Sequence, residues 1–239
     1  MDFSGAYSAE NLSYLLKGFQ VTLEVAFISI VLSFIIGSLL GIVRYAKIPV
    51  VSPIVLVVVE IIRNLPLLLI IFFVNLALPE IGIKFDVKTS AIFALTIFES
   101  AMISEIVRSG INSIDKGQIE AARSSGLTYV QTMRLVILPQ ALKRMIPPLV
   151  SQFISLLKDT SLAVVIALPE LLHNAKGIYN GNINYVIPII LMAIFMYFIV
   201  NYALSLIARW LEKRLDTNRR KDPKLGKVNK STASGGISA

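Results

Sequence analysis

Several residue types that build chemical centres are missing or rare in this 239-residue chain. It has no cysteine, which excludes a disulfide framework and any cysteine-based metal or redox site. Its one histidine, His173, cannot form a metal-binding cluster by itself. No segment matches the glycine-rich loop that holds nucleotide phosphates, because Gly226-Lys227 lacks the flanking residues of that motif. We therefore expect this chain to bind no metal, cofactor or nucleotide.

Charged residues are also scarce, at 16%, whereas hydrophobic residues reach 55% and the mean hydropathy is +0.73. These values predict an all-α membrane protein. A span needs about 20 mostly apolar residues, and five segments qualify: 19–43, 52–78, 89–107, 147–168 and 185–208. Residues 1–18 precede them, and residues 216–239 form a basic tail that we expect to be disordered. The first sixteen residues carry only acidic charges, so we expect no cleavable signal peptide.

Basic residues are distributed unevenly among the segments that join the spans. Most lie in the segments that follow the first, third and fifth spans. The segments on the other side of the membrane have only Lys17, Lys84, Lys88 and Lys176. Basic residues concentrate on the cytoplasmic side, so we expect the N-terminus outside and the C-terminus in the cytoplasm. The same distribution accounts for the net charge of +8. We expect these basic residues to contact lipid headgroups and solvent rather than nucleic acid.

The loop between the third and fourth spans has helix signals at both ends of two short segments. Two residue pairs have the spacing of capping boxes: Asp115 with Gln118, and Thr128 with Gln131. Gly126 is placed to end the first helix in a left-handed conformation, and Pro139 to end the second. Two such helices between membrane spans are suited to bind another protein. The alternative is an amphipathic loop that lies on the lipid surface.

Ionisable residues inside a span are costly and normally face protein or water. In the second span, Arg63 and Asn64 precede Pro66, whose missing backbone donor predicts a broken helix. Either this break lines a cavity, or Arg63 pairs with Glu60 on the same helical face and joins spans. At the end of the third span, Glu105 and Arg108 have the spacing of another helical pair, near the headgroups.

Polar groups also lie at mid-membrane depth in the third and fourth spans. Glu99 has no partner at helical spacing, so it is neutral, faces water, or pairs with another span, for example through Lys158. The fourth span contains a polar run: Lys158, Asp159, Thr160 and Ser161. Glu99 and Asp159 suit an ammonium group, whereas Lys158, together with Arg63, suits a carboxylate. The polar interior is therefore complementary in charge to a zwitterion.

The loop after the third span resembles a known motif. Its Glu-Ala-Ala sequence, followed by a glycine and then by Ile-Leu-Pro, is similar to the EAA loop of ABC importer permeases. In that family the loop docks in a cleft of the ATPase subunit. The residues that would couple this chain to an ATPase are Gln118, Glu120, Ala121, Ala122, Gly126, Leu138 and Pro139.

Longer runs narrow the resemblance. The segment ILPQALKRMIPPLVSQFISLLKDTSLA is similar to permeases of the polar amino-acid importers, and LPELLHNA at 168–175 resembles their glutamine and glutamate branch. The chain departs from many members at Asn64-Leu65, where they have Gly-Thr, and at Met102, where they have tyrosine. Both departures fall near the substrate path that we expect, which consists of Arg63, Asn64, Glu99, Met102, Lys158, Asp159, Thr160 and Ser161.

The resemblance implies a type I ABC importer permease fold, with five transmembrane helices in residues 19–215 and a cytoplasmic coupling loop at 115–139. It implies a multi-pass protein of the bacterial inner membrane that forms a path with a second copy or a paralogue. ABC ATPase subunits would bind ATP and Mg, and an extracytoplasmic binding protein would deliver a polar amino acid, glutamine or glutamate above all. The chain itself would be a transport subunit without catalytic residues.

Two other classes are compatible with the residues alone. An ATP-independent secondary carrier or channel for a small zwitterionic solute would use the interior charges as ion sites, although five spans cannot be halved into inverted repeats. An intramembrane enzyme would use Glu99, Asp159 or His173 as acid or base. A lone histidine in a loop near the outer end of the fourth span disfavours an enzyme.

Overall fold

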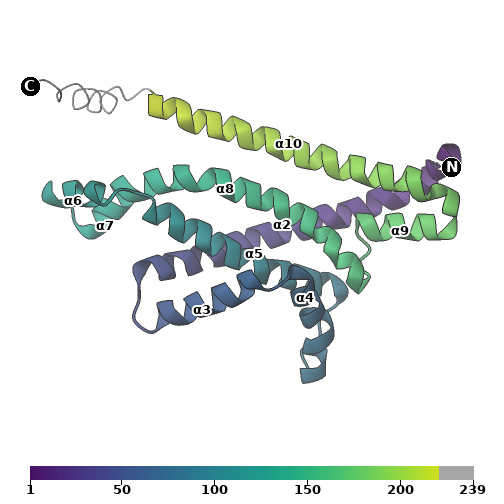
Figure 1. Cartoon of the computed structure of the whole chain (residues 1–239), viewed down its shortest axis with the longest axis horizontal. Helices are drawn as coiled ribbons and strands as arrows, with labels where there is room; N and C mark the ends of the chain where they lie inside the picture. The colour runs from purple at the N-terminus through teal and green to yellow at the C-terminus, as the bar shows by residue number, and fades with distance from the viewer. Residues whose placement is uncertain (221–239) are drawn as a thin grey trace, which may run out of the picture.

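The computed structural model of the chain describes residues 1–220, and the regular elements in that range are helices and helical turns. Four helical segments lie roughly alongside one another (Figure 1) and are long and apolar enough to cross a membrane. They are Ala9–Ala46, Val87–Asn112, Tyr129–Ile166 and Ile183–Leu211. A bent pair, Val51–Asn64 and Leu67–Ile81, makes a fifth span if it is counted as one. The protein thus has the all-α, five-span fold that the sequence predicts.

The order of the elements places two groups of short helices at opposite ends of the bundle. The first half of the chain forms α1 (Phe3–Ala6), α2 (Ala9–Ala46), α3 (Val51–Asn64), α4 (Leu67–Phe72), the π-turn η1 (Phe73–Ala77), the 3-10 turn η2 (Leu78–Ile81) and α5 (Val87–Asn112). The loop that follows contains α6 (Lys116–Ser124), α7 (Tyr129–Thr132) and the π-turn η3 (Met133–Ile137). The last elements are α8 (Leu138–Asp159), the 3-10 turn η4 (Thr160–Ile166), α9 (Leu171–Gly181), the 3-10 turn η5 (Ile183–Tyr185) and α10 (Val186–Arg220). Helices α6 and α7 lie at one end, and α9 lies with the N-terminus at the other (Figure 1). Helix α10 includes the first residues of the predicted tail, 216–239, whose remainder from 221 lies outside the described residues.

Helices α2 and α5 share the most extensive contact in the bundle. The buried face of α2 is a ladder of small residues, three or four apart: Gly18, Thr22, Ala26, Ser29, Ser33, Gly37 and Gly41. A Cβ atom on Gly37 would lie 2.7 Å from the carbonyl oxygen of Ser100, and one on Gly41 would lie 2.7 Å from that of Ser104. The two backbones are therefore in contact, which is the usual way in which membrane helices gain packing energy.

The second span is broken where the sequence predicts. Leu65 is extended (φ −89°, ψ 142°) ahead of Pro66, and the helix axis bends by 104° between the two halves of the span. Asn64 donates its side-chain N–H to the carbonyl of Glu60 at 2.7 Å in the last turn of α3, and the backbone N–H of Leu65 donates to the Ile62 carbonyl, for which Pro66 has no N–H. Beyond the break, Ile70 and Ile71 anchor α4 in the apolar core between α2 and α5.

The prediction that Pro139 ends the second loop helix is wrong. The helix continues from Tyr129 to Ile166, and Pro139 lies in the first turn of α8. The π-turn η3 comes directly before it and interrupts the regular hydrogen-bond ladder, so the missing N–H of Pro139 falls where α-helical bonding restarts. Pro147 and Pro148 also lie inside α8 without ending it.

A buried carboxylate joins the elements at the other end of the bundle. Glu170 begins α9 and accepts hydrogen bonds from the backbone N–H of Leu172 (2.9 Å) and His173 (2.7 Å). Its Oε2 also accepts from the hydroxyl of Tyr197 on α10 at 3.0 Å. Burial raises the pKa of the Glu170 carboxyl, because removal from water disfavours its charged form. This cluster fixes α9 against α10, and Asn174, which donates to the Tyr14 carbonyl at 2.8 Å, fixes α9 against α2.

A side chain at Gly41 should separate α2 from α5. We expect Gly41→Ala to lower the melting temperature of the purified protein, since overpacking a close contact costs about 1–3 kcal/mol. Gly181→Ala is the matched control, because a Cβ atom there would meet nothing within 4 Å. Equal melting temperatures for the two variants in the same detergent would contradict the close α2–α5 contact.

Candidate functional site

The loop between α5 and α8 begins with a capped helix. Asp115 accepts a hydrogen bond from the backbone N–H of Gly117 at 2.7 Å, which starts α6. The predicted return contact of Gln118 to the backbone is absent among the described residues, so that part of the prediction is wrong. Gln118 instead accepts a hydrogen bond from the side chain of Gln140 on α8 at 3.4 Å. The side chain that could complete a local cap thus ties α6 to the membrane-spanning helix.

Gly126 ends α6 as predicted. It has φ +88°, and its N–H donates to Arg123 O at 3.1 Å while the N–H of Leu127 donates to Ala122 O at 3.3 Å. These are the two hydrogen bonds of a left-handed helix end of the Schellman type. The capping box at the start of α7 is also confirmed: the backbone of Thr128 donates to the Gln131 side chain at 2.8 Å, and the backbone of Gln131 donates to the Thr128 hydroxyl at 3.3 Å.

One face of this loop is anchored and the other is open. Ala122, Thr132 and Ile137 are buried, and Ile137 joins an apolar cluster with Ile111 and Met145. Arg144 of α8 adds a hydrogen bond to the Ser113 carbonyl. The open face combines exposed Glu120, Ala121, Gly126 and Pro139 with three large apolar side chains: Tyr129 (55% exposed), Val130 (71%) and Leu135 (62%). Apolar side chains gathered on an exposed face are typical of a protein interaction site.

The deep carboxylate predicted in the third span is paired with another helix. Glu99 is only 1% exposed, and its Oε2 accepts a hydrogen bond from the side-chain amide of Gln152 on α8 at 3.1 Å. Its Oε1 has no partner among the described residues. Lys158, which the sequence offered as a partner, is exposed and makes no ion pair within residues 1–220. Half-buried Met102 lies on the same helix as Glu99.

Two hydroxyl groups in the polar run at 158–161 donate hydrogen bonds to nearby backbone carbonyls. The hydroxyl of Thr160 is buried and donates to Leu157 O at 2.7 Å, and that of Ser161 donates to Lys158 O at 2.7 Å. Asp159 is half-buried. These hydroxyls therefore support the change from α-helix to 3-10 geometry at η4. The two charged side chains of the run, Lys158 and Asp159, form no ion pair within residues 1–220.

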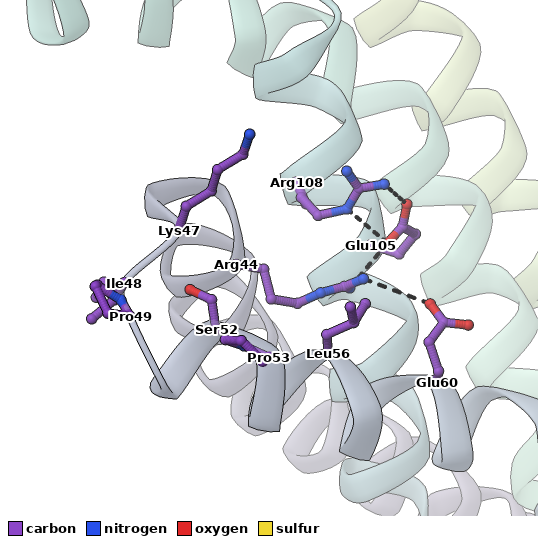
Figure 2. Close-up of a pocket in the computed structure, with 10 residues that line it drawn as sticks. All are labelled: Arg44, Lys47, Ile48, Pro49, Ser52, Pro53, Leu56, Glu60, Glu105 and Arg108. Atoms are coloured by element: carbon purple, nitrogen blue, oxygen red, sulfur yellow. Dashed lines mark hydrogen bonds and ion pairs between the residues drawn. The ribbon is translucent and has the colours of Figure 1, made fainter.

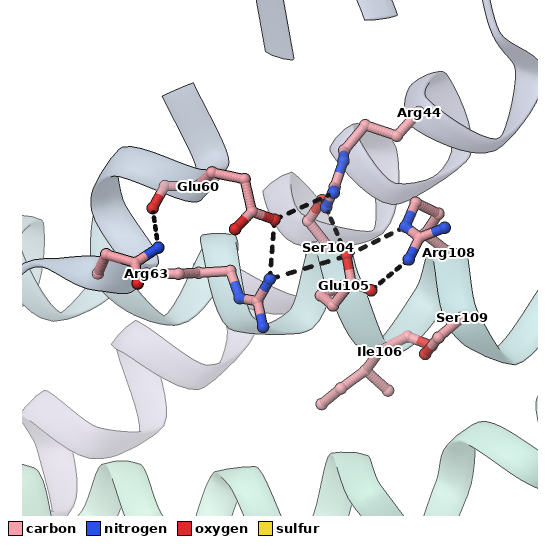
Figure 3. Close-up of polar contacts among 9 residues, drawn as sticks. Arg44, Glu60, Arg63, Ser104, Glu105, Ile106, Arg108 and Ser109 are labelled. Carbon is pink, nitrogen blue, oxygen red and sulfur yellow. Dashed lines mark hydrogen bonds and ion pairs between the residues drawn. The ribbon is translucent and has the colours of Figure 1, made fainter. Parts of the chain in front are cut away.

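An ion-pair cluster joins α2, α3 and α5 (Figure 3). Arg63 lies 3.0 Å from Glu60 and 3.9 Å from Glu105, so the pairing alternative is the one that the structure contains. Arg44 lies 2.9 Å from Glu105 and 3.6 Å from Glu60. Arg108 binds Glu105 through two guanidinium nitrogens, as predicted for this pair. No hydrogen bond or ion pair within residues 1–220 joins Arg63 to the polar groups of α8.

Two members of these clusters are not predicted from the sequence. Arg44 follows the first predicted span, 19–43, yet its side chain is only 3% exposed. Its position continues the spacing of Gly37 and Gly41, which places it on their buried face. Gln152 is a single amide in an apolar span, and the sequence alone does not show that it meets Glu99.

The fold and these sites define a class of protein: a multi-span helical transport component with a protruding loop for a partner. The family described as binding-protein-dependent transport system inner membrane component matches residues 30–217. The chain belongs to this family. Its fold is that of the type I ABC importer permeases, and it is a transport subunit rather than an enzyme.

Relatives and solved structures agree with that assignment. The chain is 67% identical over 217 residues to the probable glutamine ABC transporter permease protein GlnP of Bacillus subtilis, covering 90% of this chain and 99% of the relative. It is 34% identical to the glutamate/aspartate import permease protein GltK of Escherichia coli O157:H7, over 89% and 98% of the two chains. A crystal structure of an amino acid ABC transporter superposes with a TM-score of 0.84 at 29% identity, covering 90% and 99%. The MetNI methionine ABC transporter, at 22% identity and a TM-score of 0.68, covers 85% and 99% and shares the fold.

Arg44 should contribute more to stability than Arg63. Removing one partner of a buried ion pair costs about 3–5 kcal/mol, and Arg44 is buried between two carboxylates, whereas the Arg63 side chain is 30% exposed. We expect Arg44→Gln to lower the melting temperature clearly more than Arg63→Gln, measured in one detergent. An equal or larger effect of Arg63→Gln would show that Arg44 is not the centre of the cluster.

Proposed function

We propose that this chain is the membrane-spanning permease of an ATP-driven importer of polar amino acids, and that glutamine is its main substrate. Its high identity to a probable glutamine permease supports the choice of substrate. ATP and Mg are bound by a partner ATPase, which docks on the open face of the loop at residues 115–139. The permease forms the path with a second copy or a paralogue, and an extracytoplasmic binding protein delivers the amino acid.

The orientation follows from the basic residues. The end of the bundle that carries α6 and α7 lies in the cytoplasm, because Arg123, Arg134 and Lys143 are exposed there. The opposite end, with α9 and the N-terminus, then faces the binding protein (Figure 1). The Glu170 cluster supports this role, since it fixes α9 in a defined position at that end.

The observation that carries the proposal is a continuous helix between the two candidate sites. From Tyr129 on the exposed docking face, helical structure runs without a break through Gln152 to Ile166. A push from the ATPase on the loop therefore acts on the same helix that holds the Gln152–Glu99 contact and the polar run at 158–161. The hydrogen bond between Gln118 and Gln140 ties α6 to this helix, so that the loop moves with it.

The substrate path includes the side of α8 where Lys158 lies. A charged residue at mid-span is unfavourable in lipid, yet Lys158 is exposed and has no ion-pair partner in the described part of the chain. It therefore faces a water-filled path completed by the second permease. There it can hold the carboxylate of an amino acid, while Glu99 or Asp159 meets the ammonium group. Arg63, Asn64, Met102, Thr160 and Ser161 are the further path residues that we propose.

Docking on the loop is tested by changing its glycine. We expect Gly126→Asp to abolish copurification of the ATPase with the permease, because the left-handed end of α6 is strained by a side chain. Gly82→Asp is a close control: Gly82 has the same φ of +88° and the same open surroundings, but it follows η2, outside the loop at residues 115–139. Retention of the ATPase by Gly126→Asp, or its loss in both variants, would contradict docking at this loop.

Lys158 is tested by uptake in proteoliposomes that contain the assembled transporter. We expect Lys158→Met to reduce glutamine uptake by about tenfold or more, because a hydrogen bond to a charged group contributes about 1.5–3 kcal/mol, and to leave ATPase binding intact. Lys143→Met removes an exposed lysine from the loop end of the same helix and should leave uptake near the wild-type level. Equal uptake by the two variants would remove Lys158 from the path.

A further inference from the structure

A cleft of about 570 Å³ lies beside the ion-pair cluster, between the end of α2, the turn into α3 and the end of α5 (Figure 2). Ligand-binding pockets typically measure about 300–1,000 Å³, so it is large enough for a small molecule or a lipid headgroup. It opens at the C-terminal end of α2, which is long and apolar enough to cross a membrane. The proposed substrate path along α8 does not contribute to its lining.

Basic side chains outnumber acidic ones in the lining of this cleft. Arg44, Lys47 and Arg108 line it together with Glu60 and Glu105. Both carboxylates are already engaged, since Glu105 binds Arg44 and Arg108 and Glu60 binds Arg44.

Two donors in the cleft lack partners. Lys47 makes no ion pair or hydrogen bond within residues 1–220, and the buried Nε of Arg44 has no hydrogen-bond partner among them. The Arg44 Nε is covered by protein, whereas Lys47 is exposed. The ammonium group of Lys47 is therefore free to bind an anion in the cleft.

The backbone turn that holds Lys47 in this position is strained but fixed. Lys47 and Val50 have positive φ values of 51° and 67°, which are unfavourable for residues with a side chain, above all for a β-branched one. Ser52 fixes the turn by donating its hydroxyl to the carbonyl of Val43 at 2.7 Å. Strain of this kind is found where a local conformation serves a binding site.

The rest of the lining is apolar. Ile48, Pro53 and Leu56 form a wall next to the basic groups, and Ile48 and Leu56 are exposed. A basic pocket with an apolar wall, open between membrane helices, is suited to an amphipathic anion. A zwitterionic amino acid fits less well, because it also needs a carboxylate that is not yet neutralised.

We propose that this cleft binds one anionic phospholipid of the inner leaflet. The lipid phosphate lies between Lys47 and Arg108, and an acyl chain follows the wall formed by Ile48 and Leu56. The lipid contacts α2, α3 and α5 together, and so it stabilises the turn that connects α2 to α3, the first half of the broken span. This inference rests on the orientation proposed above but on neither the solute nor the ATPase.

Native mass spectrometry of the full chain in mild detergent tests the proposal, with phosphatidylglycerol and phosphatidylcholine added in equal amounts. We expect one phosphatidylglycerol per chain to be retained in preference to phosphatidylcholine. Each basic side chain contributes about fivefold to binding an anionic lipid, so Lys47→Gln should weaken retention by about that factor, and Lys47→Arg should preserve it. Lys143→Gln, at an exposed lysine outside the cleft, should have no effect.

Leu56→Gln serves as a second variant, since it alters the apolar wall without changing the charge. It should also weaken the retention of phosphatidylglycerol. Equal retention of the two lipids, or equal losses in Lys47→Gln and Lys143→Gln, would overturn the proposal. Displacement of the lipid by inorganic phosphate at a similar concentration would also overturn it, because the site would then take a soluble anion. Since no ATPase or solute is present, failure here is distinct from failure of the transport function.

Discussion

The close backbone contact between α2 and α5 is the constraint on which the rest of the structure depends. Small residues along α2 allow the carbonyls of α5 to approach where Gly37 and Gly41 lack a Cβ atom. Hydrophobic burial does not drive helices together within lipid, so packing at this distance supplies the association energy. The broken span, the ion-pair cluster and the Glu99–Gln152 contact all include α5 or are positioned against it.

The polar groups of the interior are arranged in layers along this helix pair. Near one end, Arg44 and Arg63 neutralise Glu60 and Glu105, so that these charges stabilise the joint of three helices. At mid-depth, Glu99 has a single amide partner and one oxygen without a partner in residues 1–220, which is a much weaker compensation. A structural role therefore suits Arg44, which is buried between the two carboxylates, and a role in transport suits Glu99.

Local chemistry in the sequence predicted local structure well. The break at Pro66, the left-handed end at Gly126 and the box of Thr128 with Gln131 each depend on neighbouring residues only, and each is present. Pro139 was misjudged because the π-turn before it is not encoded by a recognisable pattern. The partners of Glu99 and Arg44 lie on other helices, and their identity depends on how the spans pack, which a single sequence does not specify.

The two π-turns within residues 1–220 hold spare chain length at two joints. One, η3, joins the loop at residues 115–139 to α8, and the other, η1, follows the bend at Pro66. A π-turn holds about one residue more than an α-turn. Conversion of η3 to α-helix would advance α8 by about 1.5 Å and rotate it by about 100°, without breaking the helix. A screw motion of that size would turn Gln152 away from Glu99, so a change in this one turn would reach the interior contact as a discrete step.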